Sequence, residues 1–336
     1  MFNQKNVKKI MVIVFSMCLL LVGVIASYAS GENEDELKVA AVYFTPVSDP
    51  WTKAVHQALL KAKENLNISY DFTENVASSD FERVMREYAE RDYNIIFGDS
   101  FGSEEAARRV AKDYPEIAFC FGSGLGPQEP NFSVFDNWMH ESAYLCGMIA
   151  GMITETNIIG VVSGKAIPEA NRIVNGFRMG AKEVNPKVKV KIAYIGTFFD
   201  PLKAKEAAFA QIDAGADVLY GERYGVISAC SERNVLVFGN MNDQNSLAPD
   251  LVITSAIWDV YPVVKKTIFD VRNNCFRATD LKEWCMFKKG GTYLAPYYSF
   301  EKKLPIEVKE AVKKRIEEIK NDAFVVPIID STPTSD

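Results

Sequence analysis

Short continuous apolar runs alternate with amphipathic segments of helical period along most of this chain. The first pair is the apolar run at 37–44, LKVAAVYF, followed by the amphipathic segment at 49–65. Strands of a parallel sheet are buried on both faces and read as continuous apolar runs, with helices connecting them. Two such series, one ending near residue 154 and one beginning near 157, predict an α/β protein with two doubly wound lobes.

A chain of 336 residues is long enough for two domains. We predict a first lobe of residues 37–155 plus 258–280, and a discontinuous second lobe of residues 156–257 plus 281–330. Several strands would join the lobes as a hinge. Because ligands of open α/β sheets bind at the carboxyl ends of strands, the expected site is a cleft between the lobes that closes by hinge motion. The tail at 330–336 is expected to be frayed.

The first 29 residues have the composition of a secretory signal peptide. Three lysines precede an uncharged apolar run at 10–25, and Ser27 and Ala29 supply small residues at positions −3 and −1 of a cleavage site. We therefore predict that residues 1–29 direct export, to the periplasm or to the outer face of the cytoplasmic membrane. An uncleaved anchor is one alternative, and a lipid attached to Cys18 is another.

The charge balance argues against a nucleic-acid partner. The net charge is −6, and removal of the three lysines of the N-terminal segment would make it −9. Contacts to phosphates need clustered lysine and arginine side chains, and an acidic exported protein is a poor match for that need.

The cysteines and histidines predict no metal site and no cofactor. Five cysteines lie outside the N-terminal segment, and no two of them form a C-x-x-C pair. Only His56 and His140 could assist them. Cys275 and Cys285 flank a polar loop and could form a disulfide in an oxidising compartment, whereas the other three stand in apolar surroundings typical of a core.

One motif favours an enzyme. The sequence GDSFG at 98–102 has the G-x-S-x-G pattern of a hydrolase nucleophile elbow, and it stands between a predicted strand and a predicted helix. Its Ser100 would need a histidine base, and the one downstream histidine, His140, follows much sooner than in the usual Ser, acid, His order. A secreted serine hydrolase is therefore the alternative from a different class. The favoured interpretation is a polar turn that presents Ser100 to a ligand.

Aromatic, carboxylate and amide side chains follow most of the predicted strands. The candidate ligand-binding residues of this kind are Asp49, Trp51, Glu74, Ser100, Phe101, Asn137, Glu169, Phe198, Phe199, Glu222, Asp243 and Trp258. A single polar residue here can be a helix cap, as expected for Asp200 before Pro201, and a single aromatic can cover a sheet edge. Together they predict a cleft with flat apolar walls and a few directed acceptors, which suits a planar heterocycle with N–H donors. A sugar is also compatible with this chemistry.

Several motifs, taken in order, resemble those of one family. They include SDPWTKAVHQA at 48–58, ESAYLCGMIAG at 141–151, IPEANRIVNGFRMGA at 167–181, GTFFDPLKAKEAA at 196–208 and FGNMNDQNSLAPD at 238–250. With this order and spacing, most of the chain resembles the basic membrane protein family of ABC-transporter substrate-binding proteins, which includes purine nucleoside receptors. The resemblance implies a type I periplasmic-binding-protein fold and no catalysis. It also implies delivery of a purine base or nucleoside to ABC permease subunits. We expect the protein to act as a monomer.

The resemblance implies roles for single residues. Trp51 matches the aromatic that stacks on the base from the first lobe, and Phe198 or Phe199 matches the aromatic of the second lobe. Thr52 stands where nucleoside receptors often have asparagine, and it joins the candidate ligand-binding residues. Further matches are Ser100 and Glu169.

Two departures from the family pattern bear on the ligand. Nucleoside receptors commonly show G-x-D-x-D where this chain has GNMND at 239–243, so Met241 replaces the first aspartate and Asp243 keeps the second. They also place a lysine where Trp258 stands. These positions resemble ones that handle ribose. The departures therefore favour a free purine base, such as adenine, over a nucleoside.

Overall fold

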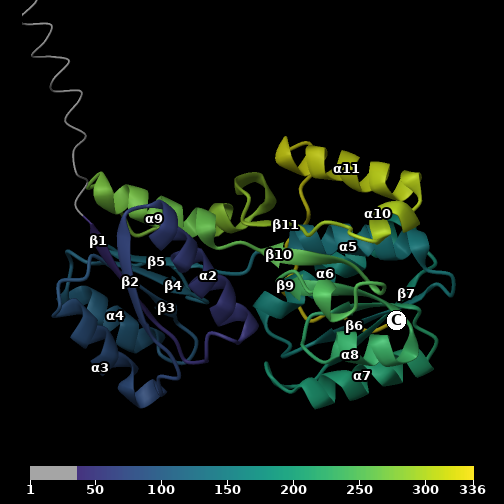
Figure 1. Ribbon diagram of the computed structural model, residues 1–336, viewed down its shortest axis with the longest axis horizontal. Coiled ribbons are helices and arrows are strands. Elements are labelled where there is room, and N and C mark those ends of the chain that lie inside the picture. The colour runs from purple at the N-terminus through teal and green to yellow at the C-terminus, as the bar shows by residue number, and fades with distance from the viewer. Residues whose placement is uncertain (1–35) are drawn as a thin grey trace, which may run out of the picture. The chain divides into compact units, whose positions relative to one another are not determined.

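The computed structural model describes residues 36–336 of the chain (Figure 1). The predicted signal peptide, with Cys18, lies outside the described residues. Within residues 36–336, no helix combines the length and the apolar character that crossing a membrane requires.

The first sheet has five parallel strands in the order β2-β1-β3-β4-β5. These strands are β1 (Leu37–Val42), β2 (Ile68–Thr73), β3 (Ile95–Asp99), β4 (Ala118–Gly122) and β5 (Phe132–Phe135). The helices packed on this sheet are α2 (Pro50–Asn65), α3 (Ser78–Ala89), α4 (Glu104–Asp113) and α9 (Tyr261–Arg272). Val39 and Ala41 of β1 pack on the side of α2 and α9. Ala40 and Val42 pack on the side of α3 and α4, so β1 is buried on both faces, which explains its continuous apolar run.

The second sheet has the strand order β11-β10-β9-β8-β6-β7, and only the β10–β11 pair is antiparallel. Its strands are β6 (Ile158–Ser163), β7 (Lys189–Tyr194), β8 (Val218–Gly221), β9 (Leu236–Met241), β10 (Val252–Trp258) and β11 (Thr292–Leu294). Helices α5 (His140–Ile153) and α6 (Pro168–Val184) cover one face, and α7 (Pro201–Asp213) and α8 (Val226–Arg233) cover the other (Figure 1). Helices α10 (Phe300–Lys303) and α11 (Ile306–Lys320) pack on the side of α5. The architecture confirms the predicted α/β fold with two doubly wound lobes.

Helices α5 and α6 approach each other unusually closely. A Cβ on Gly147 of α5 would collide with the carbonyl of Phe177, and a Cβ on Gly180 of α6 would collide with the carbonyl of Tyr144. Glycine is needed at such contacts because two backbones meet there without side chains between them. This contact places α5 with the second sheet, which differs from the predicted lobe boundary at residue 155.

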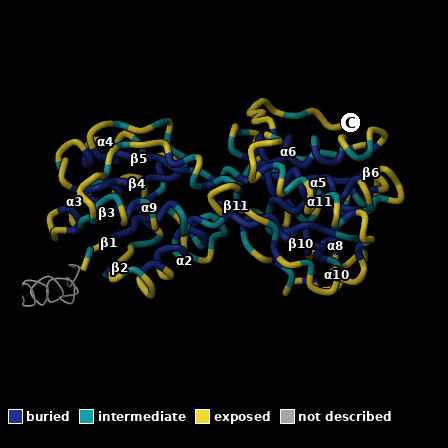
Figure 2. Tube along the Cα trace, turned by 90° about the horizontal axis from the view of Figure 1, so that it is seen from above, coloured by how far each residue is buried: buried dark blue, intermediate teal, exposed yellow. Residues whose placement is uncertain are grey.

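The chain crosses between the two sheets three times. It leaves the first sheet after β5 to enter α5, returns after β10 to enter α9, and leaves again between the 3₁₀ turn Lys282–Cys285 and β11. A second 3₁₀ turn, Phe287–Lys289, lies on this last crossing, and a third, Asn245–Leu247, follows β9. Figure 2 shows buried strands in both sheets and exposed outer surfaces on the helices.

The C-terminal tail is held along the second lobe, so the predicted fraying of residues 330–336 is wrong. The side-chain amide of Asn175 on α6 donates hydrogen bonds to the carbonyls of Ile329 and Ser331, at 2.8 and 2.9 Å. Val190 of β7 and Asp336 then exchange hydrogen bonds, 3.0 Å from Val190 N to a carboxylate oxygen and 3.1 Å from Asp336 N to the Val190 carbonyl. The tail thus covers the open edge of β7, which the sequence does not indicate because the tail is polar and rich in turn residues.

Candidate ligand-binding site

The first turn of α2 is built as predicted. Asp49 caps the helix, because its carboxylate accepts hydrogen bonds from the amides of Trp51 and Thr52, at 3.0 and 3.3 Å. The buried hydroxyl of Thr52 lies 2.6 Å from that of Thr45, and the carboxylate of Glu74 accepts a 2.6 Å bond from the amide of Val47. Asp49, Thr52 and Glu74 therefore each make hydrogen bonds within the protein, and the cap of Asp49 fixes the helical turn that carries Trp51.

Trp51 belongs to a three-ring aromatic cluster. Its ring stacks with that of Phe135, with centroids 6.1 Å apart and planes 16° apart, and it meets Trp258 at 5.3 Å and 49°. A Cβ at Gly122 would overlap the indole of Trp51, so this glycine makes room for it. The Nε1 donors of Trp51 and Trp258 are buried and find no hydrogen-bond partner among the described residues. The cluster thus holds Trp51 in place and leaves two indole donors unused.

Phe198, which follows β7, is the aromatic counterpart from the second lobe. Its ring meets Phe101 edge-on, with centroids 5.5 Å apart. The ammonium of Lys165 lies 4.8 Å from the Phe198 centroid, and the guanidinium of Arg223 lies 5.3 Å from it. The neighbouring Phe199 is 62% exposed. Phe198 is therefore held by three neighbouring side chains, whereas most of the Phe199 side chain is exposed.

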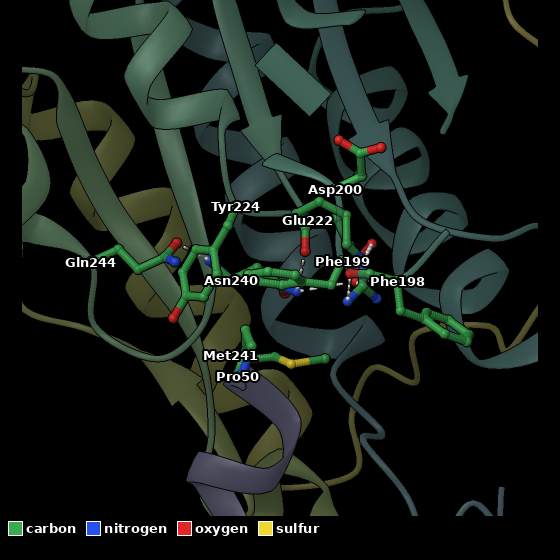
Figure 3. Close-up of a pocket in the computed structure, with 10 residues that line it drawn as sticks. Pro50, Phe198, Phe199, Asp200, Glu222, Tyr224, Asn240, Met241 and Gln244 are labelled. Atoms are coloured by element: carbon green, nitrogen blue, oxygen red, sulfur yellow. Dashed lines mark hydrogen bonds and ion pairs between the residues drawn. The ribbon is translucent and has the colours of Figure 1, made fainter. Parts of the chain in front are cut away.

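A small hollow of about 10 Å³, which we call the inner pocket, lies beside these phenylalanines (Figure 3). Its lining residues are Pro50, Phe198, Phe199, Asp200, Glu222, Arg223, Tyr224, Asn240, Met241 and Gln244. In Figure 3 the ring of Phe198 is turned to the side of the pocket opposite Tyr224 and Gln244. The volume is about that of one water probe, so in this conformation the pocket has no room for a purine or a sugar.

The acid of the inner pocket, Glu222, is buried and fully engaged. Arg223 donates to both of its oxygens, from Nε at 2.7 Å and from Nη2 at 2.6 Å. The hydroxyl of Ser163 and the amide of Gly164 donate to it at 3.0 and 3.1 Å. A buried carboxylate needs such partners, so Glu222 is a support for the pocket wall as much as a candidate acceptor.

A network of polar residues joins the first crossing segment to α6. The amide of Asn137 donates a 2.6 Å hydrogen bond to Glu169, and its carbonyl accepts one of 3.2 Å from Arg172. Arg172 is 4% exposed and also pairs with Asp136. Burial and next the charge of Asp136 raise the pKa of Glu169 well above its usual range. Glu169, Arg172 and Asp136 line an open hollow of about 900 Å³, the outer hollow, together with Ser100, Phe101 and Trp138, and the buried Asn137 lies behind them.

The turn after β3 contributes a second perturbed acid. Burial raises the pKa of Asp99 to about 7, with smaller contributions from the charges of Asp136 and Asp49. One oxygen of Asp99 accepts a 2.9 Å bond from the amide of Phe101, which opposes the shift. Perturbed acids of this kind cluster at functional sites, and near neutral pH Asp99 can either donate or accept a hydrogen bond.

The hydrolase interpretation lacks its base in this structure. The hydroxyl of Ser100 and both ring nitrogens of His140 are buried, and none of these atoms finds a partner within residues 36–336. Burial, with the charges of Arg172 and Lys282, lowers the pKa of His140 to about 3. Ser100 and His140 are therefore not hydrogen-bonded to each other, and the buried hydroxyl of Ser100 has no partner among the described residues.

Of the predicted ligand residues, Phe198, Phe199 and Glu222 line the inner pocket, whereas Trp51 lines neither this pocket nor the outer hollow. Asp243 and Trp258 line a neighbouring hollow of about 300 Å³, which we call the side pocket. Its lining residues are Ala54, Gln57, Ala58, Lys61, Met241, Asn242, Asp243, Ile257, Trp258, Asp259, Tyr293, Ala295 and Pro296. Asp243 is exposed, and its carboxylate accepts hydrogen bonds from the amide of Asn245, at 3.1 Å, and from the hydroxyl of Tyr298.

Sequence reasoning missed four charged residues of the site. Asp99 is the last residue of β3 and Asp136 directly follows β5, so the rule for strand ends could have found them. Arg172 stands one helical turn after Glu169, and this i, i+3 spacing places both side chains on one face of the helix. Arg172 could therefore have been predicted to face the cleft with Glu169. Arg223 follows Glu222 directly, and only the folded chain shows that the two side chains bind each other.

The cysteines and possible metal ligands form no special site in the described part of the chain. The five cysteines at 120, 146, 230, 275 and 285 are free, so Cys275 and Cys285 form no disulfide here. No cluster of three His, Cys, Asp or Glu side chains among residues 36–336 has the arrangement of a metal site.

Relatives of known name resemble this chain over most of its length. It is 33% identical over 301 residues to a putative ABC transporter glucose-binding protein of Haloferax volcanii, covering 88% of this chain and 75% of that protein. It is 29% identical over 324 residues to a purine-binding protein of Brucella abortus, covering 92% and 90%. A nucleoside-binding protein of an ABC transporter from Lactococcus lactis is 28% identical over 331 residues, covering 90% and 92%.

Solved structures share the fold. An ABC transporter solute-binding protein of Conexibacter woesei superimposes with a TM-score of 0.72 at 22% identity, covering 87% of this chain and 99% of that one. A transcriptional activator of the comK gene from Bacillus halodurans superimposes with a TM-score of 0.76 at 22% identity, covering 85% and 99%.

The family model that matches this chain is Bmp, described as ABC transporter substrate-binding protein PnrA-like, and it matches residues 37–287. The match confirms the resemblance drawn from the motifs. The chain therefore belongs to the PnrA-like Bmp family, whose members are ABC transporter substrate-binding proteins and not enzymes.

Proposed function

We propose that this protein captures a purine base, with adenine as the first candidate, and delivers it as a monomer to the permease of an ABC importer. The observation that carries the proposal is the pair of ordered aromatic walls, Trp51 on the first lobe and Phe198 on the second. Each ring has a fixed position, Trp51 beside Phe135 and Phe198 beside Lys165, so little side-chain entropy is lost when a ring is bound.

The polar groups in and beside the outer hollow suit the edge of a purine. Asn137, Glu169 and Ser100 offer an amide, a carboxyl group and a free hydroxyl, and Asp99 can donate or accept because its pKa is about 7. A purine base presents both N–H donors and ring-nitrogen acceptors, which this mixed set can satisfy. Closure of the hinge would bring the second wall and α6 onto the ring.

Two features bear on the choice among purines. Met241 and Trp258 place apolar side chains where the family resemblance leads one to expect ribose-handling groups, which favours a base over its nucleoside. The purine-binding relative of Brucella abortus supports the same ligand class.

Sugar capture is the second candidate. The relative of Haloferax volcanii is named as glucose-binding, and aromatic faces beside carboxylates also suit a pyranose. Calorimetry on the exported part of the chain with adenine, adenosine and glucose separates the candidates. Binding of adenine at least tenfold tighter than of adenosine or glucose, a difference of about 1.4 kcal/mol, is the expected result. Tighter binding of glucose would replace the purine proposal.

A further inference from the structure

The tail, residues 329–336, passes the ligand cleft before it reaches the edge of β7. Asp330 of the tail lines the outer hollow, together with Glu169 and Arg172 of α6. The side chain of Asp330 is exposed, and its carboxylate makes no hydrogen bond or ion pair within residues 36–336. A carboxylate that lines a cleft without a partner in the protein is a candidate acceptor for a ligand.

Two buried asparagines of α6 hold the tail beside the cleft, in a contact that we call the near anchor. The Nδ2 atom of Asn171 donates a 2.9 Å hydrogen bond to the main-chain carbonyl of Asp330. The Nδ2 atom of Asn175 donates to the carbonyls of Ile329 and Ser331, at 2.8 and 2.9 Å. Asn171 is 2% exposed and Asn175 is 6% exposed, and buried amides need such partners. The backbone on both sides of Asp330 is therefore fixed.

The same helix carries the near anchor and the charged groups of the outer hollow. Asn171 and Asn175 are spaced i, i+4 on α6, and Glu169 and Arg172 are spaced i, i+3, so two neighbouring stripes of one helix hold the tail and line the hollow. The carbonyl of the Asn171 side chain accepts a 2.8 Å bond from the hydroxyl of Tyr194 on β7, which fixes its orientation. The tail and the first turns of α6 therefore form one wall of the cleft.

The other end of the tail is held separately, in a contact that we call the far anchor. The carboxylate of Asp336 pairs with Arg178 at 2.7 Å and with Lys182 at 2.8 Å, and it accepts a 3.0 Å bond from the amide of Val190. None of these four residues lines the outer hollow. Figure 1 places the C-terminus near β7. Protection of the edge of β7 accounts for the far anchor, but it leaves the near anchor unexplained.

We propose that Asp330 is a further ligand-binding residue, which the tail supplies to the cleft and whose carboxylate accepts a hydrogen bond from an N–H group at the edge of the bound ring. This inference rests on the proposed function. An ionised carboxylate can only accept, and adenine carries N–H donors on its edge, so Asp330 recognises the donor side of the base. Closure of the cleft around the ligand strengthens the contact, because it removes water from around the charge.

The test compares Asp330→Ala with Asp336→Ala, which remove the same side chain at two positions of the same tail. Calorimetry with adenine measures affinity, and melting of the ligand-free proteins measures stability. Asp330→Ala is expected to weaken adenine binding about fivefold to tenfold and to keep the melting temperature, because its carboxylate has no partner in the protein. Asp336→Ala is expected to lower the melting temperature, because the far anchor is lost, and to keep the affinity within about twofold.

Asn175→Ala is a second, independent variant. It removes two hydrogen bonds of the near anchor, and Asn175 lines neither the inner pocket nor the outer hollow. Weaker adenine binding, by at least about threefold in the folded protein, is expected because Asp330 is no longer held at the cleft.

The remaining outcomes count against the inference in different ways. Affinity of Asp330→Ala within about twofold of the unchanged protein overturns the inference and leaves base capture in place. Equal losses of affinity in Asp330→Ala and Asp336→Ala would mean that the tail acts only through the stability of the second lobe, which also overturns it. If the unchanged protein does not bind adenine, the proposed function fails and the inference fails with it.

Discussion

The side-chain amide of Asn137, on the first crossing between the sheets, donates a 2.6 Å hydrogen bond to the carboxyl group of Glu169 at the start of α6. Asn137 is fully buried and also accepts a bond from Arg172. One amide thus connects the hinge to the two charged residues that the second lobe presents to the outer hollow. A movement of the hinge at Asn137 would therefore displace the side chains of Glu169 and Arg172 directly.

Replacement of Asn137 should disturb both folding and binding. Asn137→Ala leaves Arg172 and Glu169 each without one partner, and a buried polar group that loses its partner costs about 1–3 kcal/mol. We expect a lower free energy of unfolding by about that amount, measured with denaturant, and weaker adenine binding. Asn137→Asp is the comparison, because it keeps the bond from Arg172 but sets two carboxyl groups together. Binding by Asn137→Ala equal to that of the unchanged protein would remove this network from the site.

Trp51→Ala should weaken ligand binding at least tenfold, which corresponds to about 1.4 kcal/mol. Stacking contributes about 0.5–1.5 kcal/mol beyond area burial, and the loss of apolar contact adds to it. Calorimetry with adenine measures the change. Trp284→Ala is the control, since Trp284 lies in the turn Lys282–Cys285, away from the inner pocket. Equal affinities for Trp51→Ala and the unchanged protein would show that the indole is only part of the aromatic cluster.

Alanine variants of the neighbouring residues Phe198 and Phe199 form a matched pair, which tests which of the two rings contacts the ligand from the second lobe. Phe198 is ordered by Phe101, Lys165 and Arg223, whereas Phe199 is 62% exposed. We expect Phe198→Ala to weaken adenine binding about tenfold and Phe199→Ala to change it by less than about threefold. The reverse order in titrations of the two variants would assign the wall to Phe199.

Gly122 should control binding without touching the ligand. A Cβ at this position overlaps the indole of Trp51, so Gly122→Ala must displace the ring. We expect weaker adenine binding and a shifted tryptophan fluorescence spectrum, which a merely destabilised protein would not show while folded. The double variant Gly122→Ala with Trp51→Phe should recover part of the affinity, because the smaller ring leaves space for the methyl group. No recovery in the double variant, with both proteins folded, would contradict this steric account.

Asp99 should make stability depend on pH. Its pKa in the folded protein is about 7, above its ordinary value of 3.8, so the folded state binds the proton more tightly than the unfolded chain does. The resulting stabilisation is fully present below about pH 4 and is lost as the pH rises through about 7. Asp99→Asn keeps the acceptor for the Phe101 amide and removes the titration. Relative to this variant, the unchanged protein should lose about 1–2 kcal/mol between about pH 5 and about pH 9, a value discounted for the open cleft. Parallel stability curves for the two proteins would mean that Asp99 is not perturbed.

Local sequence patterns were sufficient to predict the main helices and strands and the residues that follow the strands. Continuous apolar runs indicated the strands because both faces of each sheet are covered, as Val39 and Ala40 of β1 show by packing on opposite sides. Asp49 and Pro50 marked the start of α2, and capping depends only on the next few residues. Trp51 and Phe198 were also found in this way, since Trp51 stands in the first helical turn after β1 and Phe198 in the loop after β7.

Tertiary structure alone decided which of these residues meet. The glycine contact between α5 and α6 moved α5 to the second lobe, and the tail found the edge of β7, although neither segment carries a local signal for its partner. Met241 came to line two hollows, and Arg172 to join Asn137, through residues far apart in the chain. Short-range propensity depends on neighbours along the sequence, whereas burial, pKa and access to a pocket depend on neighbours in space. The chain alone therefore determined the type of protein, and only its folding determined the shape of the site.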